Sequence, residues 1–428
     1  MQNHFVHHCI VFKFGGASVK DASGVKNLRR ILQQFPKQNV FVVISAVGKT
    51  TNLLEKVLDA YFNGENWREL FEQLKNNHLT IAKELMEDAS EIESVLNPIF
   101  RSLEEKLLST HSDCFEYEYD QIVSFGEILS TTLISRYLNL SGVKNQWLDV
   151  RRMLITDKSF MEAKLDWEKS AETLDAELVS HSSDQTQVFV TQGFIAGSTN
   201  NLTTTFGREG SDYSAAIIAY LLDAESVTIW KDVPGLLNAD PKFFPEAVKL
   251  DAISYEEAIE LSYYGATIIH PKTLKPLQNK NIPLYIKPFL EPEAPGSVIS
   301  ATGQADNVPS YIFKRNQILI TIFPKDFSFI SVDNLSEIFY ILSQHNVKIN
   351  LMQNTALSFS ICTDHKPRRI GEVLNQLTRN FLIKYNDNME LVTIRHYTDE
   401  IVAKVIAGRN VYAEQRSRTT VQVVVKCD

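Results

Sequence analysis

Apolar and polar residues follow two different rhythms along residues 9–300. Short continuous runs of apolar, largely β-branched residues, such as 40–44 and 227–230, predict strands that are buried on both faces. Between such runs the apolar residues recur at helical spacing, which predicts helices at 53–61, 67–85, 92–108, 122–138, 214–222 and 255–264. Strands that alternate with helices in this way predict an α/β fold with a mainly parallel sheet.

Two stretches interrupt this alternation. Residues 62–110 have helical spacing and carry no candidate chemistry, so we interpret them as a helical insertion, with a kink or break at Pro98. Prolines and glycines crowd into 288–311, which predicts a domain boundary. Beyond it, short strands and helices follow in the order βαββα, and a shorter second set of strands with one helix completes the chain, as expected of α+β domains.

Length, charge and cysteine usage narrow the class of protein. A chain of 428 residues is longer than the chain that a single hydrophobic core usually supports, so we expect two or three domains. The net charge of −9 disfavours nucleic acid as a partner. No apolar run reaches the roughly 18 residues of a membrane span, and residues 1–8 lack the basic start and apolar core of a signal peptide. The scattered cysteines form no CxxC pair, so we expect no zinc site and a reducing, cytoplasmic location.

A loop of small residues at 206–212 carries the first candidate chemistry. It follows a strand-like run at 188–190 and leads into a helix, whose N-terminus offers unpaired N–H groups and a partial positive charge to an anion. Arg208 can bind a carboxylate or phosphate through two parallel hydrogen bonds. Ser211 and Asp212 are also common N-cap residues, so a plain helix start is the alternative.

A pair of adjacent glycines provides a second candidate site. Gly15 and Gly16 follow an apolar run at 9–12, and a helix is predicted to begin soon after them. Adjacent glycines let the backbone approach a phosphate closely, and their N–H groups can line an anion-binding nest. Lys13 stands where its charge would reach the same anion. The alternative is a tight turn beside a solvated lysine.

Several motifs in a fixed order resemble one family. They are KFGGAS at 13–18, VVISAVGKTTN at 42–52, VSFGEILS at 123–130, VTQGFIAG at 190–197, TTTFGREGSD at 203–212, IWKDVPGLLNADP at 229–241 and YYGATIIHPKTLKP at 263–276. Together they resemble the aspartokinases of the amino acid kinase superfamily over residues 9–300. Residues 312–428 resemble the family's regulatory ACT domains more weakly. No GxGxxG stretch follows, so the resemblance is to the monofunctional enzymes and not to fusions with homoserine dehydrogenase.

The resemblance implies a fold and a reaction. Residues 1–300 would form a three-layer amino acid kinase fold with a mainly parallel central sheet, and residues 312–428 an ACT-like (ferredoxin-like) α+β regulatory region whose second unit is shortened. The implied reaction is transfer of a phosphoryl group from ATP, with Mg²⁺, to the side-chain carboxylate of L-aspartate. Its product, 4-phospho-L-aspartate, begins the synthesis of lysine, threonine and methionine. A carboxylate is already ionised at neutral pH, so the site needs charge compensation and no general base.

Two other functions stay open at this point. One is a catalytically weak, amino-acid-binding regulatory protein on the same scaffold. The other is a kinase of the same superfamily that acts on glutamate or a carbamate. The 206–212 loop, Glu127 and the ACT-like region argue against the latter.

The resemblance also assigns roles to residues. Lys13 would contact the transferred phosphate, and Asp212 would orient Lys13 and keep it charged. Glu127 would pair with the substrate ammonium; a solvent-facing charge on a helix is the alternative. The implied aspartate site consists of Ser45, Thr51, Glu127, Arg208 and Ser211. The implied ATP site consists of Lys13, Gly15, Gly16, Lys231, Asp232, Leu236, Lys242 and Lys272. No metal site built by the protein itself is expected.

The sequence departs from the family pattern at three positions of the kinase region. Ala17 replaces a usual threonine, which is a small change. Lys231 stands where threonine is usual, and Thr267 stands where a phosphate-binding lysine is usual. The last change removes a cation from the ATP site. Lys231 or Lys272 would restore it, and a weak or inactive kinase is the alternative.

The regulatory region departs further. Asp333, Asn334 and Asn350 match the stretch that binds an amino acid effector in the family. Asn350 and Ala356 stand where acidic residues are usual, and those acids normally pair with the effector's ammonium. We therefore expect little inhibition by lysine, with a dimerisation module that binds no effector as the alternative. We also expect a homodimer, because short strands near Val347 and Val421 would leave sheet edges that pairing covers.

Overall fold

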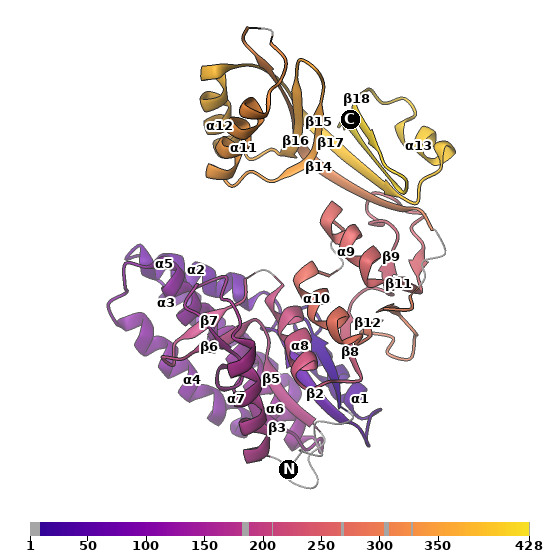
Figure 1. The fold of residues 1–428 in the computed structure, drawn as a ribbon. Helices are drawn as coiled ribbons and strands as arrows, with labels where there is room; N and C mark the ends of the chain where they lie inside the picture. The colour runs from indigo at the N-terminus through magenta and orange to yellow at the C-terminus, as the bar shows by residue number, and fades with distance from the viewer. Residues whose placement is uncertain are drawn as a thin grey trace. The chain divides into compact units, whose positions relative to one another are not determined.

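A computed structural model describes residues 9–181, 188–207, 209–266, 269–303, 308–326 and 328–427. The chain forms two compact units (Figure 1). The first comprises Met1–Leu236, Asp251–Ile259 and Ile268–Gln304. The second comprises Leu237–Leu250, Glu260–Thr267 and Ala305–Asp428. Two short segments before residue 300, Leu237–Leu250 and Glu260–Thr267, belong to the second unit. We propose the domain bounds 1–300 and 312–428 along the chain.

A central sheet organises the first unit. Among the described residues it has eight strands, in the spatial order β11 (Ala252–Ser254), β13 (Ser297–Ser300), β12 (Leu284–Pro288), β8 (Ser226–Lys231), β1 (Cys9–Phe14), β2 (Asn39–Ile44), β5 (Val188–Gln192) and β3 (Gln146–Leu148). From β12 to β3 every neighbouring pair is parallel, and β12 and β13 pair antiparallel. The mainly parallel sheet predicted from the continuous apolar runs is confirmed.

Helices cover both faces of this sheet. Alternate side chains of β1, those of Ile10, Phe12 and Phe14, belong to one hydrophobic core with the helices of the first face. These helices are α1 (Ala22–Leu32), α2 (Thr50–Phe62), α3 (Arg68–Leu85), α4 (Ser90–Leu108) and α6 (Phe125–Leu140). Helix α8 (Gly210–Leu221) packs on β1, β2 and β8 and against α10 (Pro271–Lys280). This arrangement of helices on a central sheet confirms the predicted three-layer α/β fold (Figure 1).

Two helix predictions need correction. Helix α4 continues through Pro98 as one element, so of the predicted kink or break at this position the break does not occur. The helix predicted at 122–138 is α6, but it begins later, at Phe125, because a separate helix, α5 (Phe115–Val123), ends before Ser124. Gly126 lies in the first turn of α6, where a Cβ atom would come within 3.0 Å of the Ala46 Cβ. The absence of a side chain there allows the start of α6 to pack tightly against the loop after β2.

A small sheet was not predicted from the sequence. It contains β4 (Ile155–Thr156), which precedes β5, and β6 (Ile195–Ser198) and β7 (Thr203–Thr205), which follow β5 in a segment rich in turn residues. The remaining elements between β3 and β12 are η1 (Val150–Arg152), α7 (Trp167–His181) and α9 (Tyr255–Tyr264). Within the described residues, no helix is both long enough and apolar enough to span a membrane.

The second unit is built on an antiparallel sheet. Its described strands lie in the order β15 (Ile349–Asn354), β16 (Phe359–Asp364), β14 (Ser310–Pro324), β17 (Phe381–Arg395), β19 (Thr420–Lys426) and β18 (Val411–Arg416). The helices are α11 (Val332–Gln344), α12 (Pro367–Asn380) and α13 (Asp399–Ile406), and a short hairpin of β9 (Leu236–Leu237) and β10 (Lys249–Leu250) lies at the boundary of the unit. The α+β class predicted for this region is confirmed.

The edges of this sheet differ from those expected. β15 and β18 are the edge strands, whereas Val421 lies in β19, between β17 and β18. Val347 precedes β15 and is not part of a strand. The expectation that Val421 marks an open edge is therefore wrong, because the chain's last two strands form a hairpin that covers β19.

Candidate active site

A buried ion pair lies at the carboxyl end of β1. Lys13 faces away from the core side chains of Phe12 and Phe14, toward the side of the sheet that carries α8. Its Nζ lies 2.6 Å from Oδ1 of Asp212, and the two residues are only 8% and 4% exposed. Burial alone would raise the pKa of Asp212, but the charges of Lys13 and Lys231 outweigh it and hold that pKa below its ordinary value. Asp212 is therefore a carboxylate at neutral pH, although it is buried.

The start of α8 places Asp212 at this point. Glu209 adopts a left-handed conformation, with φ of 56°, immediately before the helix begins at Gly210. Gly193, in the turn after β5, lies against Ser211, where a Cβ atom would come within 2.5 Å of the Ser211 Cβ. Only glycine fits there, so the turn after β5 presses directly on the first turn of α8. Ser211 and Asp212 are thereby fixed in a buried helix N-terminus.

The glycine pair joins two loops at the same sheet edge. A Cβ atom on Gly16 would lie 2.6 Å from the carbonyl oxygen of Ala46, so only glycine permits this contact. The amide of Gly48 donates to the carbonyl oxygen of Gly16 at 3.0 Å. The amide of Ser45 donates to the carbonyl oxygen of Phe14 at 3.1 Å. Because β1 and β2 are parallel, Gly15, Gly16 and Ser45 gather where α/β folds bind ligands.

Glu127 is buried, so the interpretation of a solvent-facing charge is wrong. It lies in the first turn of α6 and is 3% exposed. Its Oε1 accepts a hydrogen bond from the Ala46 amide at 3.2 Å, while its Oε2 is buried with no hydrogen-bond partner among the described residues. Burial raises the pKa of Glu127 to about 8, although the Ala46 amide and the charge of Lys13 both oppose this shift. Glu127 is thus a mostly protonated carboxyl poised to ionise when a cation arrives.

The remaining predicted ligands occupy varied surroundings. Thr51 lies half-buried in the first turn of α2, and Asp232 is exposed just after β8. Leu236 is buried, and its amide donates to Ser297 Oγ at 2.8 Å. Lys242 is exposed and belongs to the second unit.

The two lysines considered as replacements for Thr267 differ in their contacts. Lys231 Nζ lies 3.9 Å from Oδ2 of Asp212, beside the buried ion pair. Lys272 Nζ donates to the carbonyl of Phe206 at 2.7 Å and lies 5.5 Å from the ring centre of Tyr213. Burial lowers the pKa of Lys272. Lys272 therefore fastens the loop before α8, whereas Lys231 adds positive charge beside Asp212.

Two predicted positions fall outside the described residues. They are Arg208, expected to bind the substrate carboxylate, and Thr267, the position of the lost lysine.

Asp120 is a buried acid that the sequence analysis missed. It is fully buried at the end of α5 and accepts hydrogen bonds from the amide and hydroxyl of Thr205, at 3.0 and 2.7 Å, and from the amide of Met161. Burial raises the pKa of Asp120 to about 6 against these hydrogen bonds. Asp120 contacts β7, a strand that was not predicted from the sequence. The residues around Asp120 in the sequence therefore gave no indication of its role. Asp120 anchors the strand that leads into the 206–212 loop.

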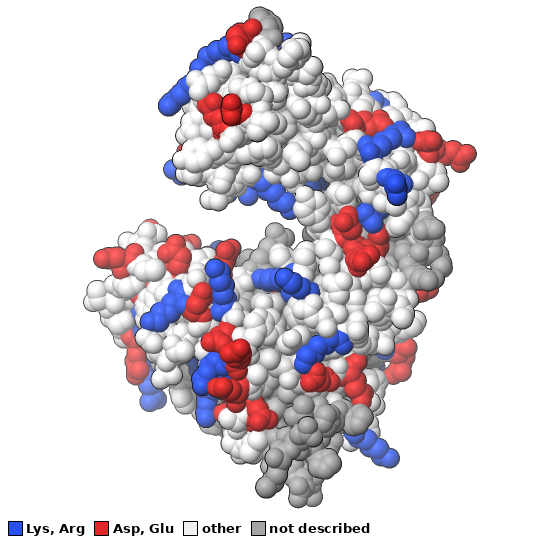
Figure 2. Space-filling model, in the orientation of Figure 1, with Lys and Arg blue, Asp and Glu red and all other residues white. Residues whose placement is uncertain are grey.

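Charged side chains elsewhere are mixed in sign. On the face shown in Figure 2, Lys and Arg are interspersed with Asp and Glu over each unit. This agrees with a chain whose net charge is −9. Lys13 and Lys231, both within 4 Å of Asp212, are a local concentration of positive charge in an acidic protein.

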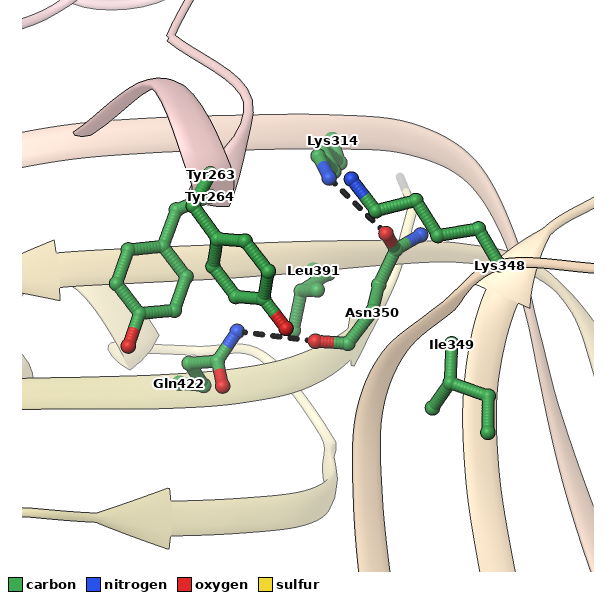
Figure 3. A pocket seen from close by; sticks show the side chains of 8 residues that line it. All are labelled: Tyr263, Tyr264, Lys314, Lys348, Ile349, Asn350, Leu391 and Gln422. Carbon is green, nitrogen blue, oxygen red and sulfur yellow. Dashed lines mark hydrogen bonds between the residues drawn. The ribbon is translucent and has the colours of Figure 1, made fainter. Parts of the chain in front are cut away.

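In the second unit, Asn350 lines a narrow pocket (Figure 3). Its Oδ1 accepts from Lys314 Nζ at 3.0 Å, and its Nδ2 donates to Asp364 Oδ1 at 3.0 Å. The amino groups of Lys314 and Lys348 approach one another above it in Figure 3. Burial, and then the charge of Lys348, lowers the pKa of Lys314. The amide at position 350 accepts from a cation and donates to an anion at the same time, whereas a carboxylate there could not donate to Asp364.

Asp333 and Asn334 lie at the start of α11, in another setting. The Asn334 side chain accepts from the Ser331 amide at 3.0 Å, and Ser331 Oγ accepts from the Asn334 amide, so the two form a capping box. Neither Asp333 nor Asn334 is among the described residues that line the Asn350 pocket. The predicted effector residues therefore lie in two places: Asp333 and Asn334 at the start of α11, and Asn350 in a polar network with Lys314 and Asp364.

The amino acid kinase family model matches residues 8–288. The lysine-sensitive aspartokinase 3 of Escherichia coli is 33% identical over 362 residues, which cover 83% of this chain and 78% of that protein. The chloroplastic aspartokinase 2 of Arabidopsis thaliana is 34% identical over 73% of this chain, which spans 58% of its length.

Solved structures agree with this result. The crystal structure of E. coli aspartokinase III with lysine and aspartate has a TM-score of 0.80 and 28% identity, over 98% of this chain and 96% of that one. The structure of the same enzyme with aspartate and ADP also has a TM-score of 0.80. The family match, the relatives and the fold agree: the chain belongs to the amino acid kinase family, and within it to the aspartokinases, the enzymes that use ATP to phosphorylate aspartate.

Proposed function

We propose that Lys13, Asp212 and Glu127 form the centre at which this chain transfers a phosphoryl group from ATP to the side-chain carboxylate of L-aspartate. One observation carries this proposal: the charge of Lys13 acts on two buried carboxyl groups, Asp212 and Glu127, which come from different helices. In phosphoryl transfer, catalysis is mostly positioning and charge compensation. A buried lysine, kept charged by Asp212, supplies such compensation where the transferred oxygens gather negative charge.

Glu127 suits the recognition of the substrate ammonium. Its Oε2 is buried with no hydrogen-bond partner in the described part of the chain, and a buried acceptor left unpaired costs free energy that a ligand donor recovers. The arriving ammonium would favour the ionised carboxylate, so aspartate binding would release a proton from Glu127 at neutral pH. Arg208 would bind the α-carboxylate, and Ser45, Thr51 and Ser211 would complete the aspartate site.

We propose that Mg²⁺ enters with ATP. Within the described parts of the chain, no group of three or more His, Cys, Asp or Glu residues is placed to hold a metal ion. Mg²⁺ commonly keeps several waters and binds through substrate phosphates with one or two carboxylates at most. When bound, it would neutralise phosphate charge. Gly15 and Gly16 would line the phosphate path, while Asp232, Leu236 and Lys242 would hold the rest of the nucleotide.

We also propose that Lys231 replaces the lysine lost at position 267. Its position beside Asp212 brings a second cation to the site, which favours an active enzyme over a weak, amino-acid-binding regulatory protein. Lys272, bound to Phe206, would instead stabilise the loop that carries Arg208.

The test is ADP release measured with L-aspartate, L-glutamate and N-acetylglutamate as acceptors. The proposal expects turnover with aspartate and at most a small fraction of it with the others. Equal turnover with glutamate would overturn the substrate assignment. Binding of aspartate without turnover would favour the regulatory alternative.

We further propose a cytoplasmic homodimer that pairs through the second unit. Apolar side chains are exposed on and beside its edge elements, including Tyr340 at 65%, Met352 at 53% and Tyr412 at 41%. Exposed apolar groups beside edge strands are typical of surfaces that a partner covers. An amino acid effector would bind near Asn350, Asp333 and Asn334. Light scattering, with and without added amino acids, tests the oligomeric state.

A further inference from the structure

Strand β7 of the first unit leads into the 206–212 loop, and one of its edges has no strand beside it. Among the described residues, β7 pairs with β6 alone. The amide of Phe206, just after β7, donates to the carbonyl oxygen of Phe194 on the β6 side at 2.9 Å. Because successive residues of a strand point their backbone groups in opposite directions, those of Thr203 and Thr205 face the other way, toward the open edge.

Two consecutive side chains in the last turn of α5 take the place of a neighbouring strand. Gln121 Nε2 donates to the Thr203 carbonyl oxygen at 2.8 Å, and Gln121 Oε1 accepts from the Thr203 amide at 3.3 Å. Asp120 accepts from the amide and the hydroxyl of Thr205 at 3.0 and 2.7 Å. The Thr205 carbonyl oxygen accepts from the Ala163 amide at 2.9 Å. The end of α5 therefore holds β7 at both of its ends.

Asp120 also holds a turn that packs against the 206–212 loop. Both of its carboxylate oxygens accept from the Met161 amide, each at 3.1 Å. A Cβ atom on Gly207 would lie 2.8 Å from the Met161 carbonyl oxygen, so only glycine permits this contact. Asp120 thus fixes both the strand from which the loop starts and the turn against which the loop rests.

The chemistry of these contacts requires an acid at position 120. Within the described parts of the chain, the donors to Asp120 are two amides and one hydroxyl. Burial raises the pKa of Asp120 only to about 6, so the side chain is mostly ionised at neutral pH. A carboxylate accepts through both oxygens, whereas an asparagine would turn its NH₂ group toward one of these donors. An asparagine of the same shape could therefore not satisfy all three donors.

The end of α5 leads directly to Glu127. Ser124 alone separates α5 from α6, and Glu127 lies in the first turn of α6. Glu127 is itself held by the Ala46 amide, and Gly126 packs closely against the Ala46 side chain. The junction of α5 and α6 therefore connects the start of the 206–212 loop to Glu127. A shift of β7 along α5 would change the distance between the loop and this carboxyl group.

We propose that Asp120, assisted by Gln121, is a positioning residue for aspartate. The two side chains hold the start of the 206–212 loop at a fixed distance from Glu127, so that the α-carboxylate and the ammonium group of one aspartate molecule are bound together. This role rests on the proposed function, in which the loop and Glu127 bind those two groups. Asp120 and Gln121 act through β7 and do not touch the substrate. A misplacement of binding groups by about 1 Å can cost about 100-fold in rate.

Steady-state kinetics of the full-length protein test this role. Asp120→Asn should raise the KM for aspartate about 10- to 100-fold and the KM for ATP less than about twofold, because contacts between the loops after β1 and β2 position the glycine pair. Thr205→Val removes the hydroxyl donor and should also raise the KM for aspartate, whereas Thr205→Ser keeps the hydroxyl and should resemble the wild type. Asp59→Asn, at an exposed acid in the last turn of α2, is the matched control and should leave both KM values unchanged.

A double variant and thermal unfolding separate positioning from stability. Asp120→Asn and Thr205→Val remove the same hydrogen bond, so their effects on the KM for aspartate should not add in the double variant. Should Asp120→Asn fail to fold, Gln121→Leu changes only a half-buried side chain and should raise the same KM.

Three results would overturn the proposal while the proposed function stands. They are a lower Tm of Asp120→Asn with both KM values unchanged, equal increases in the two KM values, and equal effects of Thr205→Ser and Thr205→Val. A wild-type protein that does not turn over aspartate would instead refute the proposed function, and the role of Asp120 in aspartate binding with it.

Discussion

Replacing Glu127 with glutamine should stabilise the protein while it damages the enzyme. In the folded state burial raises the pKa of Glu127 from 4.5 to about 8. Between these values the folded protein keeps a proton that the unfolded chain has lost, so the free energy of unfolding falls as the pH rises. Each pH unit in this window costs about 1.4 kcal/mol. At pH 8 the wild-type protein should therefore have lost roughly 4 kcal/mol that a neutral glutamine does not lose.

Tryptophan fluorescence gives a direct assay. All of the chain's tryptophans, Trp67, Trp147, Trp167 and Trp230, belong to the first unit, so their emission follows the unfolding of the unit that contains Glu127. The difference in Tm between Glu127→Gln and the wild type should be small at pH 5 and should grow up to pH 8. A change of 1 kcal/mol moves Tm by about 2–4 °C in a domain of this size.

A glutamate on the surface of the same unit provides the control. Glu72 is exposed on α3, so Glu72→Gln should give a Tm difference that does not change with pH. A Tm difference for Glu127→Gln that stays constant from pH 5 to pH 8 would show that Glu127 ionises normally, and the reasoning about its burial would fail. The same variant should bind aspartate without the proton release expected of the wild type.

Further predictions concern the other charged groups of the two units. Lys13→Ala should lower kcat about 100- to 1,000-fold with a smaller change in ATP affinity; unchanged kcat with weaker ATP binding would make Lys13 a ground-state anchor. Arg208→Ala should cost about 2–5 kcal/mol, seen mainly as a higher KM for aspartate, and a near-normal KM would remove Arg208 from the site. Lys231→Met should raise the KM for ATP and Lys272→Met the KM for aspartate, and the opposite pattern would exchange their roles. Lysine titrated against activity should inhibit little; strong inhibition that Asn350→Ala abolishes would show a working effector pocket there.

The parts of the fold that could be predicted from the sequence are those in which a continuous apolar run corresponds to a strand buried on both faces. The continuous apolar runs of β1, β2 and β8 lie in the sheet interior, where both faces of a strand are covered. The predicted strand before Gly15 and Gly16 is β1, and it ends next to them. The predicted α/β half and α+β half follow from the change in hydrophobic spacing along the chain, whereas the kinase was implied by the resemblance of the motifs.

Other features depend on contacts between distant segments and left no local pattern. Strands β6 and β7 are short and rich in Gly, Ser and Thr, and they are stabilised by pairing and by Asp120, which is 85 residues away from Thr205. Among the described residues, the Ala46 amide in the loop after β2 binds Oε1 of Glu127 and no donor binds Oε2, which is a result of packing between segments far apart in the sequence. The polar network of Asn350 explains its lack of charge only once Asp364 is seen opposite it.

Trapping of the reaction product tests the central claim most directly. The wild-type protein is incubated with ATP, Mg²⁺, L-aspartate and hydroxylamine, which converts an acyl phosphate to a hydroxamate, and ADP is measured in parallel. The account predicts aspartyl hydroxamate in amounts that match the ADP released, and loss of both in Lys13→Ala. Release of ADP without hydroxamate, or full hydroxamate formation by Lys13→Ala, would contradict the assignment of the buried Lys13–Asp212 pair as the centre that phosphorylates aspartate.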